Sequence, residues 1–589
     1  MKQFFKFMFA SMLGTFLTLI ITFILLIFIL GAVIMASSSP DTSVPQNAIL
    51  RLTLDTPIPE RSSNNPFGDL SFGGLNTQQA PGLYETVNAI KHAKTDNNIK
   101  GILLDLGNVP AGMATVEEIR NALIDFKKSG KFILAYSEIY SQKAYYMATL
   151  ANKVYLNPEG ALDFRGISGE VMFMKGLMEK LDVQIQVIRH GKFKSAVEPF
   201  LLDKMSQANK EQTSSYINAL WKQMLQGISQ SRGLSEEQLN KLADNLTGFT
   251  PELALKEKMV DQLIYKDQLL LELKNKLNIK TDKDISSINL GKYVLAIENK
   301  STSYSKDKIA IIFASGDIVS GNGDEGTIGS EGISKAIRKA RLDKNVKAIV
   351  LRVNSPGGSA LAADVIWREM VLAKKEKPVV VSMGDVAASG GYYIACAANK
   401  IFADPNTITG SIGVFGIIPN FQKALQNKLG ITFDRVSTNK HSDFIPVTRS
   451  MDTEELGIMQ MDIERIYKTF IGHVAEGRKT TPALIDSIGQ GRVWSGVDAK
   501  RLNLIDEFGG LNNAVEEAAK LAKLTKYNIM SLPALQDPFT KLVQQLTGDY
   551  KDASIRTELG EYYGYFTYLR KLAKADKIQA RLPFEMTVN

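Results

Sequence analysis

Three short turns place serine beside glycine in an arrangement that suits covalent chemistry on a carbonyl group. They lie at residues 352–359, 388–391 and 408–413, and the first two stand between a predicted strand and a predicted helix. Paired glycines let backbone N–H groups point at one spot, because no Cβ atom is in the way. At a helix start these donors favour an oxyanion. A serine there, such as Ser389 before Gly390, can attack a carbonyl carbon while the next N–H receives the developing charge.

The residues alone leave both the nucleophile and its base open. Each turn by itself also fits an ordinary helix start, because serine is a common N-cap residue. The chain has four histidines, none of them in a recognisable triad motif: His92, His190, His441 and His473. The Gly-x-Ser-x-Gly pattern is absent around Ser389, which disfavours the nucleophile elbow of an α/β-hydrolase. A lysine can replace histidine as the base when burial lowers its pKa.

The segment that carries Ser389 has a degraded copy earlier in the chain. The matching segments, 247 residues apart, are 99–104 with 346–351 and 144–158 with 391–405. At the same spacing, Gln142 stands where the later copy has Ser389, and Lys143 stands in place of Gly390. Two copies with so long a period indicate tandem domains rather than a solenoid. Only one copy kept a serine before two glycines, which favours an active site there.

The elements that must position these turns alternate between strand and helix. Predicted strands are 49–54, 101–106, 132–136, 309–313, 347–353 and 378–383; predicted helices are 83–94, 115–129, 332–342 and 359–374. This alternation indicates parallel βα units and an α/β fold. We predict domains at 48–300 and 301–530, joined to the N-terminus by a linker at 37–47. Residues 531–589 form a tail with short amphipathic helices and no functional interpretation.

Composition excludes some classes of function. The 589 residues are 44% hydrophobic and 22% charged, with a net charge of +8. The basic residues form no run with interleaved aromatics, so nucleic acid is not an expected partner. Cys396 is the only cysteine, which excludes an internal disulfide. Its small apolar neighbours favour a buried, inert thiol rather than a nucleophile.

The N-terminus has the character of a membrane anchor. Residues 7–36 carry no charge, and Lys2 and Lys6 precede them. A spanning helix needs about 20 apolar residues, whereas the apolar region of a cleaved signal peptide has about 7–15. We therefore predict residues 1–36 to be a cytoplasmic N-terminus and an uncleaved anchor. Lys2 and Lys6 keep that end in the cytoplasm, so the rest of the chain faces outward.

Two motifs resemble those of a known family. The string at 191–200, GKFKSAVEPF, resembles the lysine motif of the long form of signal peptide peptidase A, or protease IV. The string at 383–393, MGDVAASGGYY, resembles the serine motif of the same family. The anchor, the tandem repeat and residues 354–358 fit the resemblance as well. It thus spans most of the chain, and only the tail after residue 531 is weakly constrained.

The resemblance implies a Ser/Lys dyad built from two crotonase-like (ClpP-like) domains. Ser389 would be the nucleophile and Lys194 the general base, one from each domain. At a spacing of 248 residues Ser442 stands where the first copy has Lys194, so each copy retains half of the dyad. Backbone N–H groups implied for the oxyanion hole are those of Gly390 and of Gly357 or Gly358. Ser411 is implied as a second hydrogen-bond partner of the Lys194 amine.

The activity implied by the resemblance is that of a membrane-anchored serine endopeptidase. It would degrade cleaved signal peptides and similar apolar peptides at the bacterial inner membrane, with the bulk of the chain in the periplasm. The family also implies a homotetramer and no cofactor or metal. Two other interpretations remain: a crotonase-like acyl-CoA enzyme, which needs neither a Ser/Lys pair nor an anchor, and an inactive scaffold for membrane proteins.

Overall fold

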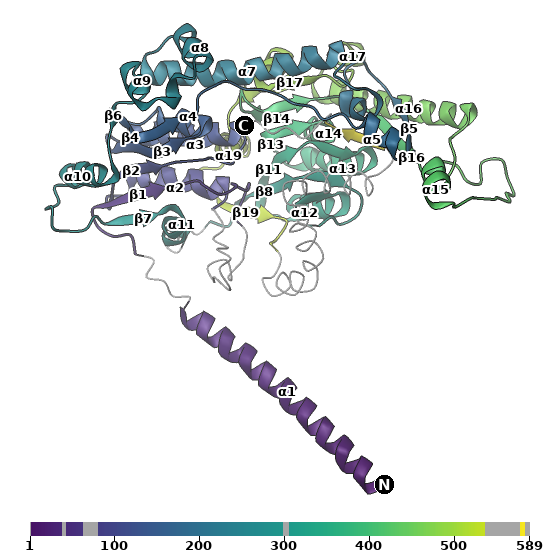
Figure 1. Ribbon diagram of the computed structural model, residues 1–589, viewed down its shortest axis with the longest axis horizontal. Helices are drawn as coiled ribbons and strands as arrows, with labels where there is room; N and C mark the ends of the chain where they lie inside the picture. The colour runs from purple at the N-terminus through teal and green to yellow at the C-terminus, as the bar shows by residue number, and fades with distance from the viewer. Residues whose placement is uncertain are drawn as a thin grey trace.

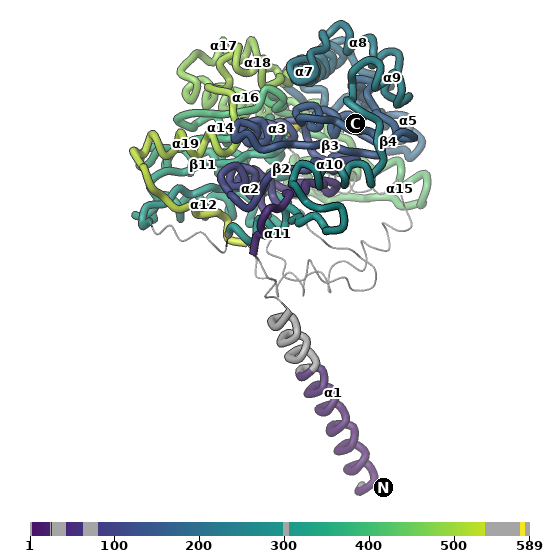
Figure 2. Tube along the Cα trace, turned by 90° about the vertical axis from the view of Figure 1, so that its left-hand side faces the viewer, coloured from purple at the N-terminus to yellow at the C-terminus, as the bar shows by residue number. Residues whose placement is uncertain are grey.

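The computed structural model describes residues 2–37, 43–62, 81–298, 305–324, 326–535 and 578–582. A long helix, α1 (Lys2–Ser37), extends away from a folded body (Figures 1 and 2). Within α1, Gln3–Phe23 has a mean hydropathy of 1.9 and is not buried against the body. By length and composition this segment is a candidate membrane span, which is consistent with the predicted anchor.

Two mainly parallel sheets that share a strand order form the centre of the body. The first has the order β6-β4-β3-β2-β1-β7. The second has eight described strands in the order β17-β15-β13-β11-β8-β19, in which only the edge strand β17 is antiparallel. Strands β14 and β18 branch from β13, so the path β18-β14-β13-β11-β8-β19 repeats the order of the first sheet. The first contains Ala48–Leu52 (β1), Ile99–Asp105 (β2), Phe132–Tyr140 (β3), Lys153–Leu162 (β4), Gln262–Leu263 (β6) and Ser287–Asn289 (β7). The second contains Lys308–Ser315 (β8), Val346–Ser355 (β11), Val379–Ala388 (β13), Lys400–Ala403 (β14), Ile408–Gly410 (β15), Val493–Ser495 (β17), Glu507–Phe508 (β18) and Asn528–Leu532 (β19). The duplication in the sequence is therefore a duplication of topology.

Strand β8 illustrates how helices cover both faces of each sheet. Ile309 and Ile311 pack with α19 (Leu511–Leu521), whereas Ile312 packs on the other face with α12 (Ser330–Leu342). Successive side chains of a strand point to opposite faces, so both sets are buried. Such continuous apolar strands are typical of parallel sheets with helices on both faces. The predicted α/β class is confirmed.

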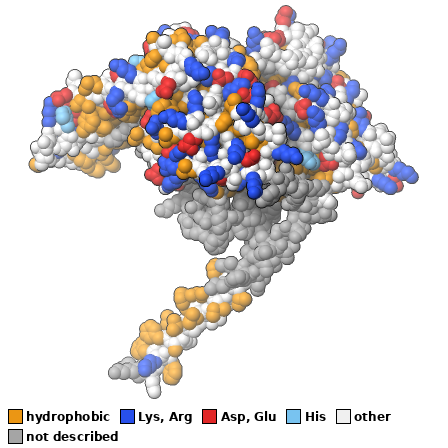
Figure 3. All heavy atoms as spheres, turned by 180° about the vertical axis from the view of Figure 1, so that it is seen from behind, with side chains coloured by type: hydrophobic (Ala, Val, Ile, Leu, Met, Phe, Trp, Pro, Cys, Tyr) orange, Lys and Arg blue, Asp and Glu red, His pale blue; other side chains and the backbone are white. Residues whose placement is uncertain are grey.

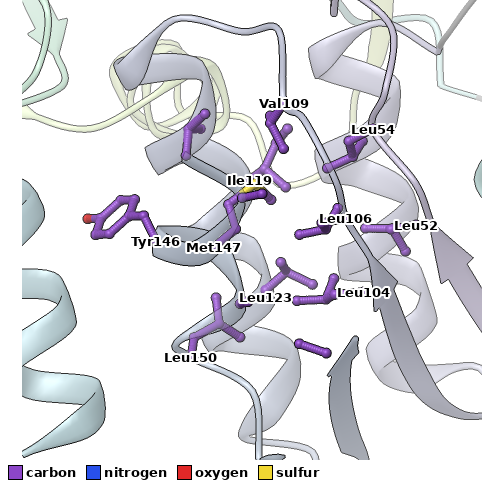
Figure 4. Close-up of a cluster of buried hydrophobic side chains, with 14 of the residues drawn as sticks. Leu52, Leu54, Leu104, Leu106, Val109, Ile119, Leu123, Tyr146, Met147 and Leu150 are labelled. Atoms are coloured by element: carbon purple, nitrogen blue, oxygen red, sulfur yellow. The ribbon is translucent and has the colours of Figure 1, made fainter. Parts of the chain in front are cut away.

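Two of the helices that cover the core of the first half pack against its sheet. These are α3 (Met113–Lys127) and α4 (Gln142–Ala148), and α2 (Leu83–Thr95) packs beside α3. Leu52 and Leu104 come from neighbouring strands and meet Leu123 of α3 (Figure 4). Each such buried side chain contributes about 1.5–3 kcal/mol. This core fixes the first half as a rigid support for the segment that follows β4.

Hydrogen bonds to side chains repeat between the two halves along with the strands. The Tyr145 hydroxyl donates to the Met259 carbonyl at 2.9 Å, and the Tyr392 hydroxyl donates to the Leu504 carbonyl at 2.8 Å. The Asn152 side-chain oxygen accepts from the N–H of Ile133 in β3 at 2.8 Å, and the Asn399 side-chain oxygen accepts from the N–H of Val379 in β13 at 2.8 Å. These buried polar contacts show that the copies share their local structure as well as their strand order.

A third sheet joins the two halves. Its order is β10-β9-β12-β20-β16-β5. The strands are Gln184–Arg189 (β5), Asp317–Val319 (β9), Thr327–Gly329 (β10), Gly357–Ser359 (β12), Phe415–Asn420 (β16) and Ile578–Arg581 (β20). Strand β5 belongs to the first half but pairs with β16 of the second, and Figure 1 shows the two together at the far end of the second half. The segment that follows β5 therefore lies beside the second half.

The C-terminal tail departs from its prediction where it is described. We predicted short amphipathic helices over residues 531–589, but Ile578–Arg581 forms strand β20, paired with β12 and β16. Four residues between two unpaired strand edges gain backbone hydrogen bonds on both sides, which outweighs a weak local preference. The helices predicted over residues 536–577 and 583–589 lie outside the described residues.

Buried charges hold the two halves together. The Arg352 guanidinium of β11 lies 2.7 Å from carboxylate oxygens of both Glu60 and Glu118. Arg352 has no exposed surface, and Glu118 comes from α3 of the first half. Nearby, the Asp385 carboxylate of β13 accepts from the N–H of Thr115 at 2.9 Å and from its hydroxyl at 2.6 Å. Asp385 thus caps the start of α3 from the other half, four residues before Ser389.

Candidate active site

Ser389 stands at a strained turn between β13 and α14 (Gly390–Ala395). Its φ is 55° and its ψ is −114°, a conformation that residues other than glycine rarely adopt. Its side chain makes no cap hydrogen bond to α14. By contrast, the N-cap of the corresponding helix α4 is Ser141, which has a φ of −67° and accepts from the N–H of Ala144. The turn therefore frees the Ser389 hydroxyl from the role that serine usually plays at a helix start.

The strain at Ser389 is maintained by neighbours that fix its backbone. Strand β13 is longer than the predicted 378–383, because it continues in parallel with β15 (Ile408–Gly410) up to Ala388. The Ser389 N–H then donates to the Gly410 carbonyl at 2.8 Å. A Cβ atom on Gly391 would lie 2.7 Å from the Ser355 carbonyl oxygen. A side chain at this glycine would therefore push the turn away from β11.

Lys194 comes from the other half and meets Ser389 inside the protein. It follows β5 and immediately precedes a short 3₁₀ turn, Ser195–Val197. Its Nζ lies 2.8 Å from the Ser389 Oγ. The same amine donates to the Ser411 Oγ at 3.0 Å and to the Ser411 carbonyl at 3.2 Å. All three partner atoms are uncharged oxygens.

The surroundings of Lys194 favour the neutral amine. Lys194, Ser389 and Ser411 have no exposed surface. Burial lowers the pKa of Lys194 well below its ordinary value, because the charged ammonium loses its hydration. An amine that is neutral near pH 7 has a lone pair and can accept a proton from the hydroxyl beside it. The arrangement can thus generate a serine alkoxide without a histidine.

The loop that carries Lys194 is held in place by a buried glutamine. Gln212 of α7 (Gln207–Arg232) donates to the Ser195 Oγ at 2.6 Å and to the Phe193 carbonyl at 3.1 Å. Its amide oxygen accepts from the N–H of Val493, on β17 (Val493–Ser495), at 3.2 Å. One side chain therefore ties the loop of the first half to a strand of the second. The amide orientation follows from these partners.

Glycines on both sides of the site allow close approach. Gly491 has a φ of 81°, and a Cβ atom there would lie 2.7 Å from the Cα and Cβ of Lys194. On the opposite side Gly357 has a φ of 102°, and a Cβ atom on it would lie 2.8 Å from the Gly390 nitrogen. The N–H of Gly357 donates to the Ser355 Oγ at 3.1 Å. The backbones of Gly357 and Gly390 therefore approach each other closely, with the Ile318 side chain beside Gly390.

The structure brings together all six residues that the sequence singled out. Lys194, Ser389 and Ser411 are joined by hydrogen bonds, and Gly357 and Gly390 approach across the same turn. Gly358 follows in β12, with a φ of 155°. Sequence reasoning missed Gln212 and Gly491, which carry no local motif and are recognisable only by their contacts with the Lys194 loop.

The positions that correspond to the dyad in the other copy have ordinary structural roles. Gln142 is buried, and its side-chain oxygen accepts from the backbone N–H groups of Arg165 and Gly166 at 3.1 and 2.9 Å. Ser442 is exposed on a loop and donates to the Asn439 carbonyl. Neither position contains a nucleophile with a buried base.

The residues that the sequence disfavoured for catalysis also have structural roles. Among the described hydrogen bonds, no histidine contacts Ser389 or Lys194; His190, for example, binds Glu464 at 2.8 Å and stacks on Tyr467. Cys396 is buried, and burial raises the pKa of its thiol to about 12. In the described part of the chain no cluster of three or more His, Cys, Asp or Glu side chains could hold a metal ion.

The fold and the site define an α/β protein that duplicates a crotonase-like (ClpP-like) domain behind an N-terminal apolar helix. Comparison with known families agrees. The model of Peptidase family S49 matches residues 125–280 and 372–525, and that of Clp protease matches residues 308–409. The first S49 segment contains Lys194 and the second contains Ser389. The chain belongs to Peptidase family S49, and it is a peptidase.

Similar proteins cover most of the chain. It is 42% identical over 518 residues to "Protease 4" of Salmonella typhi, covering 86% of this chain and 82% of that protein. It is 33% identical over 579 residues to "Protease 4" of Haemophilus influenzae, covering 94% and 92%. It is also 33% identical over 517 residues to "Serine protease SPPA, chloroplastic" of Arabidopsis thaliana, covering 86% and 74%. The suspected resemblance to signal peptide peptidase A is confirmed at the level of the family.

Proposed function

We propose that this peptidase is a serine endopeptidase in which Ser389 is the nucleophile and Lys194 is its general base. The observation that carries the proposal is the 2.8 Å contact between the Lys194 Nζ and the Ser389 Oγ in a fully buried setting. A neutral amine at this distance takes the hydroxyl proton as the Oγ attacks the scissile carbonyl carbon. The resulting ammonium then gives that proton to the leaving amine. Water hydrolyses the acyl-enzyme by the same sequence in reverse.

The oxyanion of the tetrahedral intermediate needs backbone donors close to the Ser389 Oγ. The N–H of Gly390 follows the nucleophile directly and lies at the start of α14. Of the two glycines in β12, Gly357 donates to Ser355, which leaves the N–H of Gly358 as the better second donor. Donors fixed before the reaction stabilise the transition state most, and removing one typically costs about 10²–10³-fold in kcat.

Ser411 is proposed to orient the base. Its hydroxyl and its carbonyl both accept from the Lys194 Nζ, which directs the remaining valence of the amine toward Ser389. Its backbone has a positive φ of 47°, and both oxygens reach the same amine. A long, flexible lysine is thereby restricted to one geometry before substrate arrives.

The test compares three variants on an apolar fluorogenic peptide. Ser389→Ala and Lys194→Ala are expected to lose at least about 10³-fold in kcat, because each removes half of one reacting unit. Lys192→Ala is the matched control, since Lys192 is two residues away and exposed, and it should keep wild-type activity. Proteolytic activity equal to wild type in either Ser389→Ala or Lys194→Ala would contradict the proposal. Covalent labelling of Ser389 by a serine-reactive probe separates it from an acyl-CoA enzyme, which would remain unlabelled.

The location and the substrates are proposed from the anchor and the family. Residues 1–36 would hold the chain in the inner membrane, with the linker at 37–47 and the domains at 48–300 and 301–530 in the periplasm. Released signal peptides are apolar and leave a bilayer rarely, so an anchored peptidase meets them at high effective concentration. Cleaved signal peptides that accumulate in membranes of cells carrying Ser389→Ala would support this substrate class, and unchanged levels would contradict it.

We also propose that the protein forms a homo-oligomer, a tetramer by analogy with the family. The segment around α15 (Gln422–Leu429) projects from the body, and Figure 3 shows hydrophobic side chains gathered on this projecting lobe. Leu429, Phe433 and Val436 are 66%, 51% and 100% exposed. Apolar groups this accessible on a projecting arm fit burial against a second copy of the chain.

A further inference from the structure

A buried carboxylate from the first half reaches the end of strand β11, where the proposed oxyanion hole begins. Glu60 lies between β1 and α2 and is 8% exposed. One of its carboxylate oxygens accepts from the Asn354 side-chain amide at 2.7 Å, and the other accepts from the Arg352 Nε at 2.7 Å. Two donors of the second half thus face the two oxygens of one carboxylate. An ionised carboxylate satisfies both, because each of its oxygens is an acceptor.

Asn354 lies at an irregularity in the pairing of β11 with β13. At this point residues 384–386 of β13 stand opposite residue 354 alone, and pairing resumes with the next residue of β11. The Asn354 side-chain oxygen accepts from the N–H of Val386 at 3.1 Å. Backbone groups at such a bulge lose their ladder partners, and here a side chain supplies one. Asn354 therefore fixes the stretch of β13 that leads to Ser389.

The next residue, Ser355, connects this point to the glycines of β12. The Ser355 hydroxyl donates to the Gly316 carbonyl at 2.7 Å and accepts from the N–H of Gly357 at 3.1 Å. The Gly316 N–H in turn donates to the Asn354 carbonyl at 3.0 Å. These contacts run from the bulge in β13 to the strand that contains two of the proposed oxyanion donors.

The first copy of the domain lacks all three side chains of this network. At the spacing of 247 residues, Asp105, Gly107 and Asn108 stand where the second copy has Arg352, Asn354 and Ser355. Strand β2 ends at Asp105, whereas β11 continues to Ser355. Contacts that support the fold, such as those of the paired tyrosines and asparagines, recur in both copies. A network present only in the copy with the nucleophile therefore indicates a role in the site.

We propose that Glu60 and Asn354 are positioning residues for the oxyanion hole, so that the first half contributes a carboxylate as well as Lys194. This rests on the proposed function, because it takes Gly390 and the glycines of β12 to bind the oxyanion. Glu60 fixes the Asn354 amide, and that amide joins β11 to β13 across the bulge. The backbone donors on the two strands are thereby held in place before substrate binds, as stabilisation of an oxyanion requires.

A reciprocal exchange of the two side chains tests this role. In Glu60→Gln an amide N–H₂ group faces one of the two donors, and in Asn354→Asp two carboxylates face each other. Each single variant therefore breaks the network. In the double variant Glu60→Gln, Asn354→Asp, the new amide donates to the new carboxylate and accepts from Arg352. The second carboxylate oxygen still accepts from Val386, and the net charge of the cluster is unchanged.

The expected losses fall on kcat. Each single variant should lose about tenfold or more in kcat with KM changed by less than about twofold, because the oxyanion is bound only in the transition state. The double variant should return to within about threefold of wild type, since the two sites are coupled. A peptide aldehyde, whose adduct with Ser389 mimics the tetrahedral intermediate, should lose affinity in each single variant by the same factor as kcat.

A control separates positioning from general stability. Glu369 of α13 is also a buried carboxylate, and it accepts from the Arg338 Nε of α12 at 3.1 Å. Glu369→Gln should lower the denaturant midpoint and leave kcat unchanged. An equal loss of kcat in this variant would trace the effect to stability and overturn the proposal. Single variants with wild-type kcat, or a double variant no more active than the weaker single one, would overturn it as well.

A glycine gives a second approach that leaves both side chains intact. A Cβ atom on Gly384 would lie 2.6 Å from the Glu60 Oε1, so Gly384→Ala should displace the carboxylate and lower kcat while KM stays constant. Gly457→Ala is the control, because its Cβ would meet nothing. Unchanged kcat in Gly384→Ala would count against positioning by Glu60. Activity in Ser389→Ala would instead defeat the proposed function, whatever the results at Glu60.

Discussion

At the scale of single residues, the chemistry depends on one buried lysine. Its hydrogen-bond partners are the oxygens of Ser389 and Ser411, none of which carries a charge to stabilise an ammonium. Desolvation therefore acts on the amine with no opposing ion pair, and it lowers the pKa of Lys194. The burial that lowers the pKa of Lys194 should also lower the stability of the folded protein.

The first prediction concerns pH. The unfolded chain binds a proton at Lys194 up to about pH 10.5, the ordinary pKa of lysine, whereas the folded chain releases it at a lower pH. The unfolded state thus binds more protons between the two pKa values, so stability rises with pH across that window. We expect Lys194→Met to be more stable than wild type at low pH, with the difference shrinking toward pH 10.5. Denaturant unfolding from pH 6 to 10 measures it, and a constant difference would contradict the assignment.

The pH dependence of enzyme activity should report the same titration of Lys194. Because only the neutral amine can accept the Ser389 proton, kcat/KM of the wild type should rise with pH through the lowered pKa of Lys194. A pH–rate profile without that rise between about 6 and 10 would argue for another base.

At the scale of elements, the site is assembled where three chain segments end. Strand β13 delivers Ser389 to the start of α14, β15 delivers Ser411, and β5 leads to Lys194. The strained turn at Ser389 is tolerated because pairing with β15 and the contact of Gly391 with Ser355 fix it on both sides. Backbone strain of this kind costs about 1–3 kcal/mol and persists only where the surroundings enforce it.

A glycine near Lys194 gives the prediction at this scale. In Gly491→Ala the new Cβ atom would meet the Lys194 backbone at 2.7 Å, so the loop must shift and the Nζ should leave Ser389. We expect a loss of about 10²-fold or more in kcat, since displacement of a reacting group by about 1 Å has effects of this size. Gly233→Ala is the control, because its φ of 70° imposes similar strain but its Cβ would meet nothing. It should lower stability by a comparable amount and leave kcat unchanged.

At the scale of the whole molecule, catalysis requires both halves in one arrangement. Arg352 of the second half binds Glu60 and Glu118, and burial raises the pKa of Glu60 although Arg352 opposes this. Asp385 and Thr115 add a second contact close to the strand of Ser389. These buried polar contacts fix the relative position of the halves and hence the distance from Lys194 to Ser389.

Replacing the Arg352 guanidinium by an uncharged side chain should weaken the contact between the two halves. Arg352→Met leaves two buried carboxylates without their partner, which typically costs about 3–5 kcal/mol. We expect a lower midpoint in denaturant and a fall in kcat at temperatures where the protein remains folded. The triple variant Arg352→Met, Glu60→Gln, Glu118→Gln should recover part of the stability, because no buried charge is left unpaired. A stability of the single variant equal to wild type would show that the cluster is not needed for docking of the halves.

The projecting arm should control assembly. Phe433→Asp with Val436→Asp places two charges on the exposed apolar lobe, so a second copy could no longer bury it without desolvating them. Light scattering should give a smaller particle for this variant than for wild type. Wild-type chains that already run as monomers in detergent would contradict the proposed oligomer.

The sequence by itself determined the class of fold, the duplication, the apolar N-terminal helix and the two motifs around Lys194 and Ser389. These features depend on local periodicity and on short motifs, which can be identified in the sequence without knowledge of the tertiary structure. The strands predicted at 132–136 and 378–383 ended too early, because the final residues of β3 pair with β4 beyond a register shift and those of β13 pair with β15, a strand about 20 residues further along the chain. Local pattern does not reveal such pairing.

Only the tertiary structure decided how the site is built. Gly491 meets Lys194 across almost 300 residues of sequence, and Gln212 ties the Lys194 loop to Val493, 281 residues away, so no spacing rule connects them. The same holds for β20, whose four residues have no strong strand pattern and become a strand because two unpaired edges lie on either side. Unpaired backbone N–H and C=O groups at a strand edge exist only once the sheet has assembled. The strand character of β20 therefore becomes visible only when both halves and the tail are in place.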